Sequence, residues 1–250
     1  MTDVMHQVLS KPLFRDDAYL REAFATVIAH TAEGGIILDQ TVFYATSGGQ
    51  PGDAGHLMWD AGRLAIATAV KSDGAIALVP AELTAPPPIG ARVSQHLDWT
   101  RRYGLMRMHT ALHLLSVVIP MPVTGGQIAV ARGRLDFDMP ESPPDIAALN
   151  HALNLMIARD LPVSETWITD AELDANPSLI KTMSVRPPVG QGRVRLVRIG
   201  MGETQVDLQP CGGTHVARTA EIGTIKIGKI EKKGRQNRRV YLHLDDDIVT

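Results

Sequence analysis

The chain has 250 residues, of which 44% are hydrophobic and 21% charged, and its formal net charge is −2. That length suits one large or two modest domains with buried cores. The near-neutral charge excludes a protein that attracts nucleic acid over its whole surface, so any RNA binding needs a local basic patch. Aromatic residues make up 4% of the chain, and aliphatic side chains must therefore fill the core.

The single cysteine excludes an internal disulfide and favours a reducing compartment. No apolar run approaches the roughly 20 residues that a membrane-spanning helix needs. The N-terminal residues do not place a basic segment before an apolar one, so no signal peptide is expected. We expect a cytoplasmic protein without a membrane partner, and the sequence gives no evidence of an obligate protein partner.

Residues 1–95 are predicted to form a small β-barrel or meander. Short apolar runs separated by turn residues predict strands at 25–29, 35–39, 64–70, 75–79 and 91–94. The polar residues 71–74 lie between two of these runs and predict a hairpin. The stiff, proline-rich segment 85–90 cannot be helical, and a domain boundary is expected close to residue 95.

A glycine-rich segment lies inside this β-rich region. It runs from Phe43 to Gly55 and includes Gly48, Gly49 and Gln50. Its glycines permit positive φ angles and the close approach of a ligand. The simpler interpretation is a turn of the barrel. The segment is not a nucleotide-binding fingerprint, because it has neither the six-position dinucleotide pattern nor the phosphate-loop lysine.

Residues 96–250 are predicted to form a second, mixed domain that begins with a helix. Asp98 or Thr100 can cap the start of this helix. Pro120 prevents its continuation, because proline lacks the N–H that a helix interior requires. The helix should therefore end before Pro120 and present apolar faces.

The remaining elements follow one another without a regular strand–helix–strand repeat. We expect a glycine turn at 123–128, a second amphipathic helix at 143–157 and a short helix at 170–175. Strands are expected at 134–139, 193–199, 222–230 and 240–244. This irregular mixture favours the α+β class.

Two short motifs in the second domain carry residues that bind metals. His109 and His113 lie four apart in the predicted helix, which places both imidazoles on one face with Cβ atoms about 5–6 Å apart. Cys211 and His215 flank two glycines, a spacing that suits a tight turn presenting both side chains to one point. Each motif alone has an ordinary structural explanation, but together they predict zinc. Thr110 stands where a zinc protease would carry its glutamate, which argues against a protease.

In this order, the motifs resemble those of the freestanding alanyl-tRNA editing proteins, the AlaX family, related to the editing domain of alanyl-tRNA synthetase. The resemblance rests on His109–His113, Cys211–His215, Glu221–Gly223, Asp39–Tyr44 and Gly48–Asp53. It covers nearly the whole chain. Two positions depart from the family pattern, since Ala45 replaces a proline and Leu112 replaces a threonine.

The resemblance implies a β-barrel domain over residues 1–95 and a zinc-binding α+β editing domain of the threonyl- and alanyl-tRNA synthetase type over residues 96–250. It also implies that the zinc ligands are His109, His113, Cys211 and His215. The implied activity is trans-editing: hydrolysis of the ester that joins a wrong amino acid, serine or glycine, to tRNA(Ala). Zinc would either activate water or only position the substrate, and a set of four protein ligands leaves both roles open.

Selecting serine requires a contact with its hydroxyl group. The candidates are Thr110, Thr124 and Gln127, and an ordinary helix or turn role is the alternative for each. Contacts with tRNA are expected from the glycine-rich motif and from the basic tip of a C-terminal hairpin, for which a solvated turn is the alternative. The residues concerned are Gly48, Gly49, Gln50, Lys232, Lys233, Arg235, Arg238 and Arg239.

Two other functions stay open from the sequence. One is a zinc hydrolase that cleaves a small ester or amide without tRNA. The other is a zinc-stabilised RNA-binding module that catalyses no turnover. Cleavage of a small aminoacyl ester would favour the first, and RNA binding without turnover would favour the second.

Overall fold

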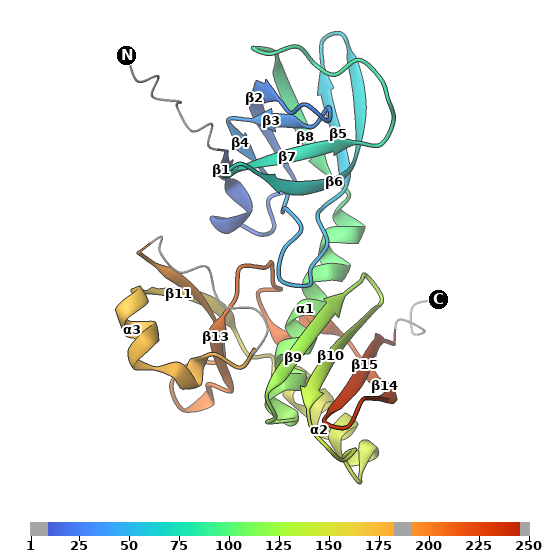
Figure 1. The fold of residues 1–250 in the computed structure, drawn as a ribbon, viewed down its shortest axis with the longest axis vertical. Coiled ribbons are helices and arrows are strands. Elements are labelled where there is room, and N and C mark those ends of the chain that lie inside the picture. Colours follow the sequence, from blue (N-terminus) through green and yellow to red (C-terminus); the bar gives the residue numbers. More distant parts are fainter. Residues whose placement is uncertain (1–9, 183–191, 246–250) are drawn as a thin grey trace. The chain divides into compact units, whose positions relative to one another are not determined.

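The computed structural model describes residues 10–182 and 192–245. Its contacts divide the chain into two compact units (Figure 1). The first unit comprises Met1–Ser47 with Pro51–Arg102, and the second comprises Gly48–Gln50 with Tyr103–Thr250. Independent folding of two domains that meet near residue 95 stays a prediction.

The first unit is built on a closed barrel. Its strand order is β2 (Glu22–His30), β3 (Ile36–Leu38), β7 (Ala75–Pro80), β6 (Gly62–Ser72), β5 (Gly55–Trp59) and β8 (Arg92–Leu97). The predicted barrel and its five strands are confirmed, and among the barrel strands the sequence analysis missed β5. The predicted hairpin is formed by β6 and β7, where Asp73 and Gly74 adopt positive φ angles of 42° and 84°. Outside the barrel, β1 (Lys11–Pro12) pairs with β4 (Gln40–Thr41).

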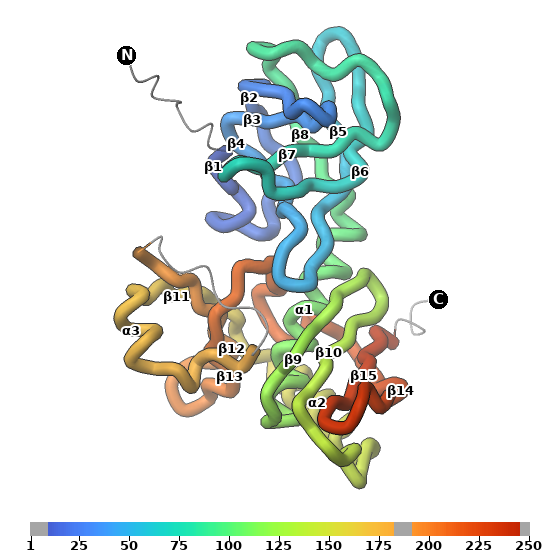
Figure 2. The backbone as a smooth tube through the Cα atoms, viewed as in Figure 1, coloured from blue at the N-terminus to red at the C-terminus, as the bar shows by residue number. Residues whose placement is uncertain are grey.

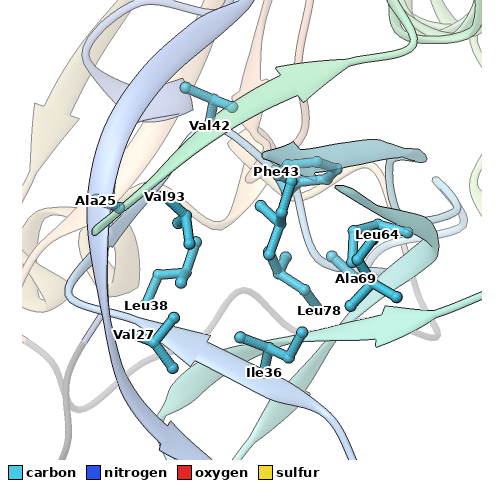
Figure 3. Close-up of a cluster of buried hydrophobic side chains, with 12 residues drawn as sticks. Ala25, Val27, Ile36, Leu38, Val42, Phe43, Leu64, Ala69, Leu78 and Val93 are labelled. Carbon is cyan, nitrogen blue, oxygen red and sulfur yellow. The ribbon is translucent and has the colours of Figure 1, made fainter. Parts of the chain in front are cut away.

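Aliphatic side chains fill the barrel, as the composition predicts (Figure 3). Leu64 and Ile66 of β6 alternate with exposed residues, so one face of this strand points inward. Phe43 is the aromatic member of the cluster and is 0% exposed. Burying each large side chain stabilises the fold by roughly 1.5–3 kcal/mol. Phe43, the first residue of the glycine-rich segment, and Val42 before it belong to this cluster. The segment therefore begins in the barrel core.

A buried ion pair ties that region to the start of the long helix. The side chains of Arg102 and Asp53 are 0% and 1% exposed, and Arg102 Nε lies 2.9 Å from Asp53 Oδ1. Arg102 also donates to the carbonyls of Ala18 and Val42, at 2.9 and 2.6 Å. Asp53 accepts a further bond of 2.6 Å from the Tyr44 N–H. These contacts fix both ends of the segment between Val42 and Asp53.

The long helix α1 (Trp99–Val118) has the boundaries that its sequence predicts. Asp98 Oδ1 accepts a hydrogen bond of 3.0 Å from the Arg101 N–H, which confirms Asp98 as the cap. Leu105, Met108 and Leu115 are buried at 0% exposure in the second unit. The helix thus carries its histidines into a core.

The described residues of the second unit form two sheets in addition to helices (Figures 1 and 2). The four-stranded antiparallel sheet has the order β14 (Ile225–Lys233), β15 (Asn237–Leu244), β10 (Arg132–Asp138) and β9 (Val123–Ile128). The other sheet contains β11 (Val163–Ile168), β12 (Val194–Ile199) and β13 (Asp207–Pro210). The other α-helices are α2 (Ile146–Ala158), capped by Asp145, and α3 (Asp170–Ala175). Short 3-10 turns span Leu13–Arg15, Pro177–Leu179, Gly202–Thr204 and Thr219–Ile222. The α+β class is confirmed.

The predicted glycine turn at 123–128 is wrong, because these residues form strand β9. Gly125 and Gly126 pair with Asp136 and Leu135 of β10. The close approach is at Gly49, where a Cβ would lie 2.8 Å from the Gly126 carbonyl oxygen. The Ile128 N–H also donates to the Gly49 carbonyl at 2.9 Å. Residues 48–50 therefore lie against β9, and their interpretation as only a barrel turn is wrong.

Two smaller differences from the predictions concern the first residues of a strand and of a helix. Strand β14 begins at Ile225, because residues 219–222 form a 3-10 turn. At the start of α2, Ile146 is 41% exposed, whereas Leu153 and Ile157 of the same helix are buried. Among the described residues, none of the helices combines the length and the apolar character needed to cross a membrane.

The buried ion pair gives a stability prediction. Asp53→Ala should lower the free energy of unfolding by about 3–5 kcal/mol, because Arg102 would keep an uncompensated buried charge. Asp16→Ala is the matched control, since the Lys11–Asp16 pair is exposed at 63% and 66% and should contribute at most about 1 kcal/mol. Urea unfolding measures both values. A loss below 1 kcal/mol for Asp53→Ala would contradict this account.

Candidate metal centre

Four side chains from two distant segments converge in the second unit. His109 and His113 lie on α1, and Cys211 and His215 follow β13. Their ligand atoms all lie within 4.8 Å of one another. Cys211 Sγ lies 3.4 Å from His109 Nε2 and 3.3 Å from His215 Nε2. Two ligands on one tetrahedral zinc ion, with bonds of about 2.3 and 2.0 Å, would be about 3.5 Å apart. The spacing therefore fits a metal such as zinc.

The turn that carries Cys211 and His215 requires a glycine at position 213. A Cβ on Gly213 would lie 2.2 Å from His109 Cε1, so a larger residue would displace that imidazole. Arg195 of β12 holds the turn from outside, since its Nη1 donates to the carbonyls of Cys211 and Gly213 at 2.8 and 3.0 Å. The motif thus brings its two ligands together by a close backbone approach, as its sequence predicts.

Each imidazole has an oxygen acceptor at Nδ1, which leaves Nε2 for a metal. His109 Nδ1 lies 2.8 Å from Gln50 Oε1. His113 Nδ1 lies 2.9 Å from Asp207 Oδ2, and His215 Nδ1 lies 3.1 Å from Thr110 Oγ1. Acceptors of this kind fix the tautomer and the ring orientation of metal-binding histidines. The three partners complete a site whose ligand nitrogens all face one point.

Gln50 is held by bonds at both ends of its amide. Its Nε2 donates to Thr214 Oγ1 at 2.8 Å, and its Oε1 also accepts from the Thr214 N–H at 3.1 Å. The side chain is 0% exposed. The tRNA contact predicted for Gln50 does not fit this position, because a fully buried amide presents no surface to a phosphate backbone. The structure gives it the task of orienting His109.

Thr110 is also occupied within the protein. A hydroxyl group has one hydrogen to donate and two lone pairs to accept with. Its hydrogen goes to the Met106 carbonyl at 2.9 Å, and its oxygen lies within 3.1 Å of His215 Nδ1 and 3.3 Å of the Val216 N–H. This capacity is filled, so the predicted contact of Thr110 with a substrate hydroxyl does not fit the structure.

Asp207 holds the imidazole of His113 and is itself buried. Lys181 Nζ and Gln209 Nε2 donate to its two oxygens, at 2.5 and 2.8 Å. Burial acts to raise the pKa of Asp207, but the bond and charge of His113, together with Lys181, lower it overall. The carboxylate therefore stays ionised and can accept the Nδ1 proton of His113.

Burial and nearby charges also shift the pKa values of three of the four candidate ligands. Burial lowers the pKa of His113, but hydrogen bonds with Asp207 and Cys211 outweigh it and raise that pKa to about 9. Burial and the charge of His109 lower the pKa of His215 to about 3. Burial raises the pKa of the Cys211 thiol, yet the charges of His109 and His215 lower it well below its ordinary value. The site thus favours the thiolate, which is the form that binds metals.

The other predicted contacts lie on β9 and on the β14–β15 hairpin. Thr124 lies at the register shift between β9 and β10, and its hydroxyl lies 3.1 Å from the Asp136 carbonyl and 3.2 Å from Asn237 Oδ1. Gln127 is exposed and accepts a bond of 3.2 Å from Arg134 Nε. Gly48 and Gly49 are exposed.

The hairpin predicted between β14 and β15 is confirmed, and its basic residues differ in exposure. Lys232, Lys233 and Arg235 are exposed. Arg238 is 8% exposed and donates to the Pro140 carbonyl, so it offers little surface to RNA. Arg239 is ion-paired with Asp136. The contacts of these residues with tRNA stay predictions.

Comparison with known proteins places the chain in a family. Residues 194–241 match the family model described as threonyl and alanyl tRNA synthetase second additional domain, and residues 17–101 match that of class II (A) tRNA synthetases. The alanyl-tRNA editing protein AlaX-M of Methanosarcina acetivorans is 34% identical over 249 residues, which cover 95% of this chain and 100% of that protein. The chain belongs to the AlaX family of alanyl-tRNA editing proteins.

Other relatives fit the same assignment. AlaX-M of Methanosarcina barkeri is 34% identical over 95% of this chain and 100% of its own length. The alanine–tRNA ligase of Pyrobaculum arsenaticum is 34% identical over 93% of this chain, but the match covers only 26% of that enzyme. The chain thus spans a whole AlaX protein and about a quarter of a ligase, and the resemblance expected from its motifs is confirmed.

Sequence reasoning missed Asp207, Gln209, Lys181 and Arg195, and it did not predict the bond between Gln50 and His109. No spacing pattern connects these residues to the histidines. Gln50 lies 59 residues before His109, and Asp207 lies 94 residues after His113. The one usable signal was the position of Gln50 in the glycine-rich AlaX motif.

The orienting role of Gln50 can be measured. Gln50→Ala should weaken metal binding about 10- to 100-fold, because His109 Nδ1 and the Thr214 N–H would lose their acceptor. Gln95→Ala is the control, since Gln95 is equally buried at 0% exposure but bonds to Thr41 in the barrel. Competition with a chelating indicator reports both affinities. Equal affinities for native protein and Gln50→Ala would contradict the role.

Proposed function

We propose that this protein is an aminoacyl-tRNA deacylase that hydrolyses the ester between a wrong amino acid and tRNA(Ala). One observation carries the proposal: a convergent set of three histidines and one cysteine in a chain that matches AlaX editing proteins over their full length. The match to a synthetase additional domain supports the same conclusion. The protein acts in trans, on tRNA that another enzyme has charged, and the reducing compartment favoured by its single cysteine is the cytoplasm.

The metal that we propose is zinc, held by His109, His113, Cys211 and His215. A mixed nitrogen and sulfur donor set is typical of zinc, and the sulfur–nitrogen distances of 3.3 and 3.4 Å fit a tetrahedral ion. When bound, zinc supplies a Lewis acid that can polarise a carbonyl group or lower the pKa of water. The chain's own residues contribute orientation: Gln50, Asp207 and Thr110 each hold the outer nitrogen of one imidazole.

The amino acid that we propose is serine, with glycine as the second candidate. Thr124 is the contact that we propose for the serine hydroxyl, on the ground of its position in β9. A β-bulge often turns a side chain toward a site, and Thr124 lies at such a register shift. Gln127 is placed on the outer face of the sheet, beside Arg134, where it suits a contact with RNA better than a contact with the amino acid.

The main test is release of labelled amino acids from tRNA(Ala). Native protein should release serine and spare alanine, and Cys211→Ala should reduce serine release to the background rate because the ligand set is incomplete. His151→Ala should retain the native rate, since His151 is exposed on α2 and outside the cluster. Metal content and folding are measured on each variant.

Two results would reject deacylation. A folded, metal-loaded native protein that binds tRNA but releases no amino acid would be a zinc-stabilised RNA-binding module. Hydrolysis of small aminoacyl esters at a rate that tRNA does not improve would indicate a small-substrate hydrolase.

Thr124→Val should reduce the preference for serine over alanine by about 10- to 100-fold while metal binding stays native, because one hydroxyl contact is lost. Thr124→Ser keeps the hydroxyl and should keep the preference. Rates on Ser-tRNA(Ala) and Ala-tRNA(Ala) give the ratio. An unchanged ratio in Thr124→Val would show that another group senses the substrate.

A further inference from the structure

The outer face of the four-stranded sheet carries a group of arginines that the proposed reaction does not use. Arg132, Arg134 and Asp136 alternate along β10 and so share one face. Gly133 lies between them on the other face, where a Cβ would be 2.8 Å from Met108 of α1. The arginines therefore point away from the helix. Figure 1 shows β9, β10 and β15 side by side.

Strand register gathers five side chains on this face. Arg134 pairs with Tyr241 of β15 and with Gln127 of β9, and Asp136 pairs with Arg239. Arg132 and all of these residues except Asp136 line a surface hollow of about 200 Å³. We call this group the arginine face: Gln127, Arg132, Arg134, Arg239 and Tyr241.

The charges of the arginine face are fixed and unbalanced. Arg134 Nη1 lies 2.8 and 2.9 Å from the two oxygens of Asp136, and Arg239 donates to the same oxygens at 2.7 and 2.8 Å. One carboxylate thus orients two guanidinium groups. Among the described residues, Arg132 forms no ion pair and is exposed. Glu231 of β14 pairs in register with Arg239 and lies 3.3 Å from the Tyr241 hydroxyl, and Lys229 and Lys233 are ion-paired with Glu231. Asp138 follows Asp136 on the same face of β10. The three arginines and two lysines against three carboxylates leave a local excess of positive charge in a chain of net charge −2.

This chemistry fits the backbone of RNA. Guanidinium groups bind phosphate oxygens through two parallel hydrogen bonds, and orientation by Asp136 reduces the entropy lost on binding. Tyr241 and Gln127 add an aromatic ring and an amide, which contact bases and ribose hydroxyls in RNA complexes. An acidic protein segment would use the arginines but would leave this mixture of ring and amide without a purpose.

The arginine face is connected to the metal centre through the edge of the sheet. Gln127 belongs to the face, and the next residue, Ile128, donates its N–H to the Gly49 carbonyl at 2.9 Å. Gln50 follows Gly49 in the chain, and its side-chain oxygen lies 2.8 Å from His109 Nδ1. An RNA strand on the face would thus lie beside the edge strand that leads to the proposed zinc ligands.

We propose that the arginine face binds the sugar–phosphate backbone near the acceptor end of tRNA. The proposal rests on the proposed function for the identity of the RNA, and it assigns Arg132, Arg134 and Tyr241, which lie outside the basic hairpin tip. Because these side chains stand on paired strands, they hold the RNA in one orientation relative to the site.

The experiment measures binding of uncharged tRNA(Ala), which does not depend on catalysis. Affinity is determined between 50 and 200 mM salt for native protein, Arg132→Ala and the double variant Arg132→Ala with Arg134→Ala. We expect the single variant to bind about tenfold more weakly and its salt slope to fall by about one. The double variant should lose more. Arg63→Ala, an exposed arginine of β6, should bind as the native protein does.

A second pair of variants separates the face from the hairpin. Lys232→Ala with Arg235→Ala removes two charges from the tip and should weaken binding less than the face variants do. Metal content and the urea midpoint confirm that each variant is folded. Native affinity and slope in both arginine variants would overturn the proposal. Binding of polyglutamate as tight as that of tRNA would also overturn it, because the face would then select charge alone.

The outcomes distinguish this proposal from the proposed function. If native protein binds tRNA through the arginine face but releases no amino acid, the deacylase fails and the RNA surface stands. If native protein releases serine and the arginine variants bind as the native protein does, the RNA surface fails and the deacylase stands.

Discussion

Three imidazoles and one thiol converge in this fold, and a hydrogen-bond partner at Nδ1 orients each imidazole. Gln50, Asp207 and Thr110 take the three Nδ1 positions, and each of them is itself fixed by further hydrogen bonds. Without these partners the rings could turn and present either nitrogen. The orientation of the ligand set thus depends on a buried polar layer, and polar groups in such a layer must all be satisfied to be stable.

The glycine-rich segment runs from the barrel core to the candidate metal centre, and close backbone contacts determine where it needs glycine. Val42 and Phe43 are anchored in the barrel core, whereas Gly48–Gln50 belong by their contacts to the second unit. Gly49 must lack a side chain because the Gly126 carbonyl is so close, and Gly213 must lack one because His109 is. Glycines that appear to be turn residues in the sequence therefore create the space in which Gln50 and the histidines meet.

Most of the fold followed from local patterns in the sequence. The period of the apolar residues and the Asp98 cap correctly located α1, and the two histidines four apart are one half of the cluster that could hold a metal. The elements that were predicted wrongly depend on distant contacts. Gly125–Gly126 read as a turn because their pairing with β10 has no local signal, and Thr110 bonds to a histidine 105 residues away. Such partners are set by tertiary packing, which a single sequence does not display.

We propose that the three histidines and Cys211 hold one zinc ion, and X-ray absorption at the zinc edge, on protein purified without added metal, measures the atoms around it. We expect about one zinc per chain in a shell of three nitrogens and one sulfur, with bonds of about 2.0 and 2.3 Å. A metal-free protein that takes up no zinc, or a shell of oxygen and nitrogen without sulfur, would contradict it.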